Sequence, residues 1–468
     1  MKTLVLDDDP TGTQSATGVP VLLDLGPDEA ALTDRIAEAL RTDDALYVLT
    51  NSRALGEAEA VALVGRIRRA ALAAAGRLGD GIRFVLRGDS TLRGHVFAES
   101  DAFATEGSVL LFVPAFPAGG RTTRGGVHHV RVGDTDIPAA GTEYADDPVF
   151  GFRSSRLDEY TAEQGGGRPA RLVPLAALRD TGGEALAEAL LTADAGTVLA
   201  PDAVCDADID LVHQALERAW AAGRDIVVRC AAPLAARCAD ATSTGLLPTP
   251  LSRPAGPVLV VCGSHTSGAT AQLAFLERER GVRPVVLGTD AALADPVAAG
   301  RDLVARARGE LRDRGIAVLA SERLRRAEDN TLDHGERVMT ALTVAVRLLA
   351  GEFAAVIAKG GITSAEVART GLDARVARVR GQLLTGISVW DLPARGDGGN
   401  GDEGNGDGGN GGEGSGDGGS GDEGDGSDGG GAGGVKEAGA DGVVPYVVVP
   451  GNVGGEETLV KAVEGLGA

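Results

Sequence analysis

Residues 257–281 read PVLVVCGSHTSGATAQLAFLERERG, and this stretch passes from an apolar run through a polar turn into a helical pattern. The five consecutive apolar residues 258–262 are typical of a strand that is buried on both faces of a sheet. Residues 268–281 then place apolar side chains at helical spacing. A strand that leads directly into a helix is the building unit of parallel sheets covered by helices. The stretch therefore predicts an α/β fold.

The same alternation extends in both directions along the chain. Further strands are expected at TLVLDD (3–8), ALYVLT (45–50), IRFVLRGD (82–89), VLLFVPAF (109–116), RPVVLGT (283–289), IAVLAS (316–321), AAVIAKGG (354–361) and YVVVPGN (446–452). Helical patterns occupy 28–41, 57–77, 296–314, 335–351 and 456–465. Residues 114–171 are rich in Gly, Arg, Asp and His, and we expect them to form a long irregular stretch of functional importance.

We predict two α/β domains with mainly parallel sheets flanked by helices, and an active site in the cleft between them. The first domain would span 1–240 and the second 257–468. Residues 241–256 contain prolines and small polar residues without a periodic apolar stripe, as is typical of a linker.

Composition excludes several classes of protein. The chain has 468 residues, of which 43% are hydrophobic, and its formal net charge is −22. This acidity argues against a protein that coats nucleic acid or an anionic membrane. No apolar run reaches membrane-spanning length, acids interrupt any signal-peptide core, and the four cysteines show no CxxC spacing. We therefore expect a cytoplasmic enzyme that binds small molecules, with no nucleic acid or membrane partner.

Much of the negative charge lies between residues 396 and 434. Of these 39 residues, 22 are glycine and ten are acidic, and none is basic. Such a segment has almost no apolar side chains to bury, so we expect a disordered acidic insert. Its GNGDEG follows no strand and would repel a pyrophosphate, so it is not a nucleotide-binding fingerprint. Because loop closure costs little additional entropy as a loop lengthens, we expect its deletion to preserve folding and turnover.

The first strand ends in the acidic turn Asp7, Asp8 and Asp9. Ligands of open α/β sheets bind at the carboxyl ends of strands, so these three acids are candidates for substrate binding. Three adjacent carboxylates could supply a general base and a ligand for Mg²⁺. The alternative is an acidic turn that caps the next element. We favour Asp8 as the proton acceptor, with Asp89 as the second choice.

A second polar turn, RGDSTLRGH, follows another strand at residues 87–95. Its Arg93 could bind a carboxylate or a phosphate, and the hydroxyl groups of Ser90 or Thr91 could form hydrogen bonds with hydroxyls of a ligand. The alternative is a helix cap beside a surface arginine. The candidate substrate-binding residues here are Arg87, Asp89, Ser90, Thr91 and Arg93, with Arg121 as a further cation. Adjacent His128 and His129 would face opposite ways on a strand, so we favour substrate contact or a structural role over a metal site.

Three glycine-containing turns in the second half follow strands and resemble a cradle for phosphate groups. No GxxxxGK[ST] motif is present, so this is not a Walker-type loop. For Lys359, contact with phosphate and simple packing at a strand end are about equally plausible. The candidate nucleotide-binding residues in these turns are Ser264, Thr266, Lys359, Gly360, Gly361, Ile362, Thr363, Gly451 and Asn452.

Taken together, these motifs resemble the four-carbon acid sugar kinase family (YgbK-like, or Hrp-dependent type III effector-like proteins). The resemblance covers nearly the whole chain, through LDDDPTGTQSATGVPVL, LTNSRAL, RGDSTLRGH, PAFPAGGRTTRGGVHHV, DDPVFGFRSSRL, VVCGSHTSGATAQL, KGGITSAEVARTGL, GQLLTGISVW and PYVVVPGNVGGEETL in family order. One departure is PGN, where many members have a lysine-containing turn.

The resemblance implies an N-terminal domain that binds the acid sugar and a C-terminal domain that binds ATP with Mg²⁺. The expected reaction phosphorylates a terminal hydroxyl of a 3-oxo-tetronate, threonate or erythronate. By motif, Asp8 and Arg93 would contact the substrate, whereas Ser264, 360–363 and Gly451 would contact ATP. The metal ligands remain unassigned, and a homodimer is allowed. One alternative is a catalytically silent binding protein on the same scaffold. Another is a nicotinamide dehydrogenase, but this sequence has no credible GxGxxG motif after a strand.

Overall fold

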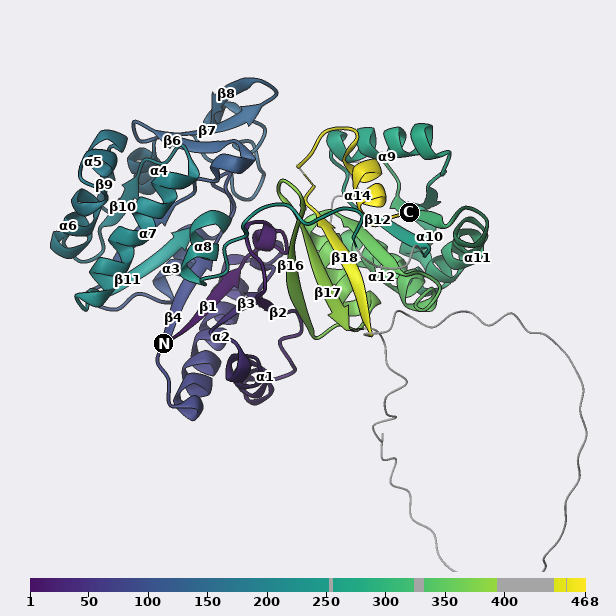
Figure 1. The fold of residues 1–468 in the computed structure, drawn as a ribbon, viewed down its shortest axis with the longest axis horizontal. Coiled ribbons are helices and arrows are strands. Elements are labelled where there is room, and N and C mark those ends of the chain that lie inside the picture. The colour runs from purple at the N-terminus through teal and green to yellow at the C-terminus, as the bar shows by residue number, and fades with distance from the viewer. Residues whose placement is uncertain (252–255, 324–331, 394–441, 452) are drawn as a thin grey trace, which may run out of the picture.

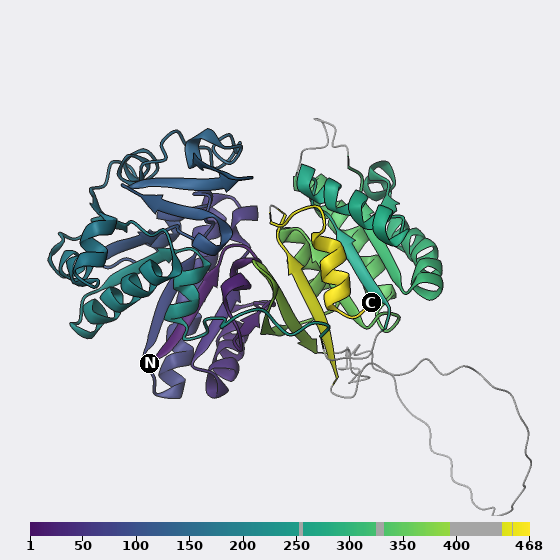
Figure 2. The same cartoon turned by 45° about the horizontal axis from the view of Figure 1, so that its top comes forward.

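The computed structural model describes residues 1–251, 256–323, 332–393, 442–451 and 453–468. The expected insert at 396–434 and the candidate Asn452 lie outside these ranges. The described residues form two α/β lobes that lie side by side, with the N-terminus in one and the C-terminus in the other (Figures 1 and 2).

A single mixed sheet runs through both lobes, in the order β13-β14-β12-β15-β18-β17-β16-β2-β3-β1-β4-β11-β5-β10-β9. Its strands are β1 (Lys2–Asp7), β2 (Pro20–Leu22), β3 (Ala45–Leu49), β4 (Ile82–Arg87), β5 (Val109–Val113), β9 (Ala170–Val173), β10 (Val198–Pro201), β11 (Ile226–Cys230), β12 (Val258–Cys262), β13 (Val285–Leu287), β14 (Ile316–Ser321), β15 (Ala355–Lys359), β16 (Val376–Leu384), β17 (Ile387–Pro393) and β18 (Val443–Val449). All the expected strands are present, and their pairing within each lobe is mainly parallel.

The junction between the lobes is antiparallel, which the apolar patterns did not indicate. Strand β16 pairs antiparallel with β2 on one side and with β17 on the other, and β17 pairs antiparallel with β18. The two expected sheets are therefore one continuous sheet. Buried Trp390 of β17 donates from Nε1 to Thr13 Oγ1 at 2.8 Å, which links the second lobe to the turn after β1.

The helices cover both faces of this sheet. They are α1 (Glu29–Thr42), α2 (Glu57–Leu78), α3 (Val96–Asp101), α4 (Leu157–Gln164), α5 (Leu175–Asp180), α6 (Glu184–Thr192), α7 (Asp206–Ala221), α8 (Ala232–Cys238), α9 (Ser267–Arg280), α10 (Thr289–Ala294), α11 (Pro296–Arg314), α12 (Leu332–Leu348), α13 (Gly361–Glu366) and α14 (Thr458–Gly465). One apolar core, under α6–α8 and α10–α12, continues through both lobes. On the opposite face, separate cores lie under α1–α4 and under α9 and α14.

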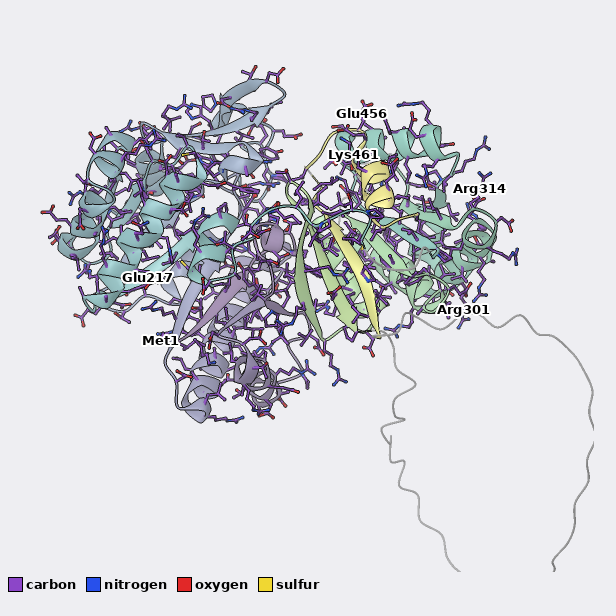
Figure 3. All side chains as sticks on the ribbon, viewed as in Figure 1. Met1, Glu217, Arg301, Arg314, Glu456 and Lys461 are labelled. Atoms are coloured by element: carbon purple, nitrogen blue, oxygen red, sulfur yellow. The ribbon has the colours of Figure 1, made fainter. Side chains whose placement is uncertain are left out.

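Charged side chains point outward from these helices. Arg301 and Arg314 of α11 and Lys461 of α14 project from the outer surface of the second lobe (Figure 3). Among the described residues, no helix combines the length and apolar character needed to cross a bilayer.

Residues 114–171 are more regular than we expected. They contain a three-stranded antiparallel sheet, here called the arm, formed by β6 (Arg121–Arg124), β7 (Val127–Val132) and β8 (Thr135–Pro138). Two glycines form the β6–β7 turn with positive φ, 60° at Gly125 and 77° at Gly126. Buried Asp202 accepts both of their backbone N–H groups at 2.8 Å and so fixes this end of the arm to the first lobe.

Candidate active site

One cavity of about 640 Å³ is lined by residues of both lobes. From the first lobe it receives the turns that follow β1, β3, β4 and β5, and from the second lobe the turns after β12, β15 and β18. Its wall includes Asp9, Thr11, Gln14, Asn51, Arg53, Arg87, Asp89, Ser90, Arg93, Phe116, Arg121, Glu143, Tyr144, Asp147, Phe150, Gly263, Ser264, Thr266, Gly360, Gly361, Ile362, Thr363, Pro450, Gly451 and Val453. Most of the expected site residues thus meet at the carboxyl ends of neighbouring strands.

The three acids after β1 have different surroundings. Asp7 is buried and accepts from Arg87 Nη1 at 2.9 Å, beside Gly12, where a side chain would collide with the carboxylate. Asp9 lines the cavity, and its carboxylate accepts from Arg53 and from Thr11. Burial acts to raise the pKa of Asp9, but Arg53, Arg87 and the Thr11 hydrogen bonds outweigh it and hold the pKa below its usual value.

Asp8, our first choice as the base, does not line this cavity. It is buried and accepts from Arg229 Nη2 at 2.9 Å, while Arg229 Nη1 lies 2.5 Å from Glu99 Oε2. Burial raises the pKa of the Asp8 carboxyl despite the neighbouring arginines. In this structure Asp8 supports the acidic turn from behind, because Arg229 on β11 holds it there, and direct contact of Asp8 with a substrate stays a prediction. Arg229 itself lies in an apolar strand pattern that offered no sign of a site.

Arg53 is a site residue that sequence reasoning missed. It follows β3 within the quoted motif LTNSRAL, and its side chain is 18% exposed. Its guanidinium bonds to Asp9 and lies 3.4 Å from Asp89 and 3.7 Å from Asp8. Burial opposes its charge, but these carboxylates raise its pKa further above the usual value. Arg53 therefore holds the two acidic turns together.

The RGDSTLRGH turn brings Asp89 and Arg93 to the cavity. Arg93 Nε donates to Asp89 Oδ2 at 2.9 Å, and Thr91 Oγ1 donates to the same oxygen. Although burial acts to raise the pKa of Asp89, Arg93, Arg53 and the Thr91 hydrogen bond place it well below its usual range. Ser90 lines the cavity, whereas Thr91 is fully buried and does not. The Thr91 hydroxyl donates to Asp89 in this structure, and its contact with a substrate stays a prediction.

His128 supports the same turn from the arm. Its Nε2 lies 2.9 Å from the Ser90 carbonyl oxygen and its Nδ1 lies 3.0 Å from Thr123 Oγ1. The ring is fully buried, and burial lowers its pKa to about 4. A neutral imidazole has one donor and one acceptor, so Nε2 donates to the carbonyl and Nδ1 accepts from the hydroxyl. His129 faces away, as neighbouring residues on a strand do, and the role of His128 is structural.

Further cavity residues come from the segment after the arm, where we named none. Arg93 lies over the Tyr144 ring at 4.9 Å from its centroid, and its Nη1 lies 3.6 Å from Asp147 Oδ2. Both partners belong to a stretch that lacks a strand or helix pattern, although Asp147 is in the quoted motif DDPVFGFRSSRL. Non-local contacts of this kind cannot be inferred from periodicity.

The glycine turns of the second lobe pack against one another. Thr266 Oγ1 donates to the Gly451 carbonyl at 2.9 Å and lies 3.3 Å from Ser264 Oγ. Gly360 has φ of 114°, and a Cβ there would lie 3.2 Å from the Cβ of Ser264. Backbone groups thus form much of this cavity wall, as a phosphate site requires.

Lys359 lies behind these turns and does not line the cavity. Its side chain is fully buried, and Nζ donates to the Pro450 carbonyl at 2.7 Å. Burial lowers the pKa of Lys359 to about 8. In this structure Lys359 supports the turn after β18, because backbone carbonyls hold its ammonium group, and its contact with ATP stays a prediction. The guanidinium group of Arg87 is likewise engaged by the protein, because its Nη1 donates to Asp7 Oδ1 at 2.9 Å.

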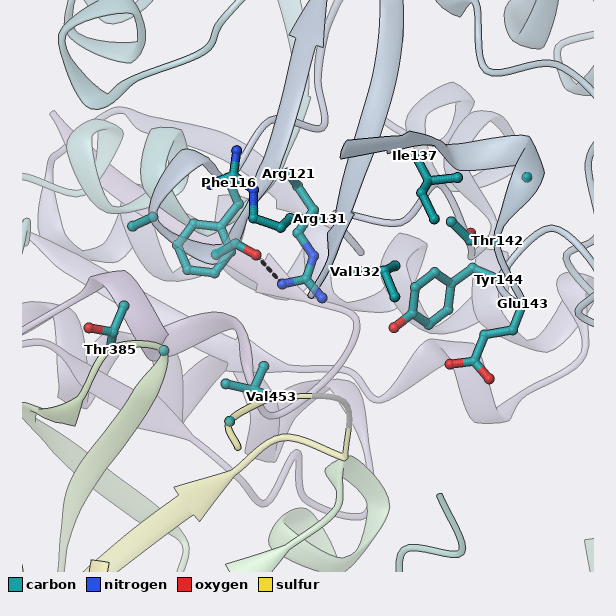
Figure 4. Close-up of a pocket in the computed structure, with 15 residues that line it drawn as sticks. Phe116, Arg121, Arg131, Val132, Ile137, Thr142, Glu143, Tyr144, Thr385 and Val453 are labelled. Atoms are coloured by element: carbon teal, nitrogen blue, oxygen red, sulfur yellow. Dashed lines mark hydrogen bonds between the residues drawn. The ribbon is translucent and has the colours of Figure 1, made fainter. Parts of the chain in front are cut away.

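A second cavity of about 630 Å³ adjoins the first (Figure 4). The arm and the residues after it form one side, and Thr385 and Val453 of the second lobe form the other. Arg121 and Tyr144 line both cavities. Arg121 Nη1 donates to the Gly119 carbonyl.

The comparisons with known proteins agree with this division of the cavity. Residues 3–238 match the family model of a sugar-binding N-terminal domain, and residues 259–459 match that of a nucleotide-binding C-terminal domain. The chain belongs to the four-carbon acid sugar kinase family.

Two relatives of this family are named D-threonate kinase. The chain is 33% identical to the Bordetella bronchiseptica protein over 291 residues, which cover 58% of this chain and 62% of that protein. It is 28% identical to the Cupriavidus necator protein over 326 residues, covering 65% of this chain and 71% of that protein. The match to the first relative therefore spans less than two thirds of its length. A Haemophilus influenzae structure of the DUF1537 family has the same fold, with a TM-score of 0.59, 16% identity and 98% coverage of both chains.

Proposed function

We propose that this protein is an ATP-dependent kinase that phosphorylates a terminal hydroxyl of a four-carbon acid sugar, with D-threonate as the first substrate to test. The observation that carries the proposal is one cavity lined by two kinds of wall: acids and arginines of the sugar-binding domain, and glycine turns of the nucleotide-binding domain. The names of the relatives support threonate, since both are D-threonate kinases.

The nucleotide side supplies mainly positioning. Transfer of a γ-phosphoryl group needs alignment and charge neutralisation more than covalent chemistry from the protein. Backbone N–H groups of Gly361 and Gly451 would hold phosphate oxygens, and the Ser264 and Thr266 hydroxyls would add hydrogen bonds, whereas the Gly360 N–H donates to the Val449 carbonyl. Cations then come from the opposite wall, where Arg53 and Arg93 line the cavity.

On the substrate side we assign the hydroxyl-facing role to Asp9. Its carboxylate packs against Gly361 of the nucleotide domain: a Cβ on Gly361 would lie 2.5 Å from Asp9 Oδ2. Its lowered pKa keeps it ionised at neutral pH, so it can accept the hydroxyl proton or orient that hydroxyl for in-line attack. Asp89 is held by Arg93 and Arg53 and would orient the sugar, while Asp8 keeps the turn in place through Arg229.

The residues present fit a Mg²⁺ ion that arrives with ATP. Mg²⁺ keeps several waters and binds through phosphate oxygens and one or two carboxylates, and Asp9 offers one such carboxylate in the cavity wall. Among the described residues there is no group of three or more His, Cys, Asp or Glu side chains that could hold a metal ion. Bound there, Mg²⁺ would neutralise phosphate charge. A cytoplasmic location and a homodimer remain predictions.

The test is ADP release with Mg²⁺-ATP over a panel of D- and L-threonate, D- and L-erythronate and their 3-oxo derivatives. We expect turnover on one acid, with a kcat at least 100-fold lower in Asp9→Asn. If no acid supports turnover while ATP still binds, the assignment to four-carbon acids is wrong. If ATP does not bind, the silent binding protein becomes the better explanation.

A further inference from the structure

The arginines of the cavity differ in whether an acid already balances their charge. Arg53 pairs with Asp9 and Asp89, and Arg93 pairs with Asp89 and Asp147. Arg87 is paired with Asp7 as well. Each of these guanidinium groups therefore has a carboxylate partner supplied by the protein itself.

Arg121 has no such partner among the described residues. It stands at the start of β6, lines both cavities and is only 8% exposed. Nη1 donates to the Gly119 carbonyl, whereas the buried Nε has no hydrogen-bond partner in the structure. A guanidinium group has five N–H donors, so most of its hydrogen-bonding capacity is unused here. Burial of a charge without an opposite charge is unfavourable, and a bound anion would remove that cost.

The position of Arg121 decides which anion fits. It belongs to the sugar-binding half of the cavity wall, together with Phe116 and Tyr144, whereas the glycine turns belong to the nucleotide-binding half. A guanidinium fork matches a carboxylate or a phosphate through two parallel N–H···O bonds, so it is the place of Arg121 in the sugar-binding domain that favours the carboxylate of the sugar. We propose that Arg121 binds the carboxylate of the acid sugar and thereby sets the direction in which the substrate lies. This proposal rests on the proposed kinase function.

That direction has a chemical consequence. With its carboxylate at Arg121 on the arm, the substrate extends across the cavity toward Asp9, which packs against Gly361. The hydroxyl at the far end of the carbon chain then faces the nucleotide turns, and hydroxyls near the carboxylate do not. Arg121 would thus account for selection both of an acid over a neutral polyol and of the terminal hydroxyl as acceptor.

The experiment compares an acid with its neutral analogue in wild type and Arg121→Met. We expect the KM of D-threonate to rise about 10- to 100-fold in Arg121→Met, as for loss of a charged hydrogen bond, while the KM of ATP and the kcat/KM of threitol stay unchanged. Arg121→Lys keeps the positive charge but lacks the guanidinium fork, so its KM for D-threonate should lie between those of the wild type and Arg121→Met. Arg124→Met is the matched control, because it removes one positive charge from the exposed end of the same strand. Equal losses for acid and polyol, or a loss confined to ATP, would overturn the proposal.

Binding gives a readout that does not depend on turnover. D-Threonate should raise the melting temperature of the wild type and of Arg124→Met, threitol should not, and Arg121→Lys should lose most of the shift. This measurement also covers the case in which Arg121→Met fails to fold. If the wild type lacks kinase activity but shows the Arg121-dependent shift, the proposed reaction fails and the carboxylate site stands. If turnover is present but Arg121→Lys keeps the full shift, the carboxylate site fails alone.

Discussion

The substitution Gly361→Ala tests the contact between the two halves of the cavity with a single methyl group. Gly361 begins α13, and only Gly360 separates it from the strand that ends in Lys359. A Cβ built there lies 2.5 Å from Asp9 Oδ2 and 3.2 Å from its Cγ. The Asp9 carboxylate cannot simply swing away, because Arg53 and Thr11 hold it. The methyl group therefore acts on the acid that we place beside the reacting hydroxyl.

The size of the effect follows from the distance. Ordinary contact for a Cβ begins near 3.4 Å, so the carboxylate must retreat by ~0.9 Å. A displacement of about 1 Å in a reacting group costs roughly 100-fold in rate, and we expect kcat to fall by that order. Stability should change little: overpacking costs about 1–3 kcal/mol, and replacing glycine in a helix recovers about 1 kcal/mol.

The assay measures kcat and both KM values by ADP release, together with urea unfolding. Gly268→Ala is the matched control, since it lies in the first turn of α9 and a Cβ there meets nothing within 4 Å. We expect the control to keep wild-type kinetics. A Gly361→Ala enzyme with kcat within threefold of wild type would refute the placement of Asp9 at the reaction centre.

Three further predictions concern buried polar groups. Burial lowers the pKa of His128 to about 4, so the free energy of unfolding should fall by about 3 kcal/mol as pH drops from 6.5 to 4. His128→Gln should abolish this part of the pH dependence in urea unfolding, and an unchanged pH dependence would contradict the prediction. Burial lowers the pKa of Lys359 to about 8, so this group should add up to about 3 kcal/mol of stability as pH rises from 8 to 10.5. The stability difference between wild type and Lys359→Met in urea unfolding should grow by that amount over this window, and a constant difference would contradict it. Trp390→Phe removes the hydrogen bond to Thr13 and should cost about 1–3 kcal/mol in unfolding free energy; a cost near zero would show that this link between the lobes contributes nothing.

The fold was readable from the sequence wherever the signal was local. Continuous apolar runs such as 258–262 marked the central strands, and helices such as 296–314 were found to the residue. Strands β2 and β9–β11 were missed because they are short or lie among alanine-rich helical patterns. The antiparallel junction at β16 and β17 was missed because strand pairing across more than 300 residues leaves no periodicity.

The sequence predicted those parts of the candidate site that depend on local patterns. Polar turns directly after apolar strands pointed to the carboxyl ends of the strands, where Asp9, Asp89 and Arg93 do line the cavity. What separates Asp9 from its neighbour Asp8 is an arginine on β11, 221 residues further along the chain. Likewise, the sequence allowed Lys359 to be a phosphate ligand, whereas the structure buries its ammonium group against the Pro450 carbonyl. These roles depend on contacts between residues that lie far apart in the chain, and a single sequence does not show which of them meet.

In the proposed reaction, this cavity transfers a phosphoryl group from ATP to an acid sugar. The most direct test incubates the protein with Mg²⁺-ATP and D-threonate and follows the products by ³¹P NMR and mass spectrometry. We predict a phosphomonoester of the acid, which forms in step with ADP and is absent with Asp9→Asn. ADP formed together with inorganic phosphate, at the same rate with and without each acid of the panel, would contradict it.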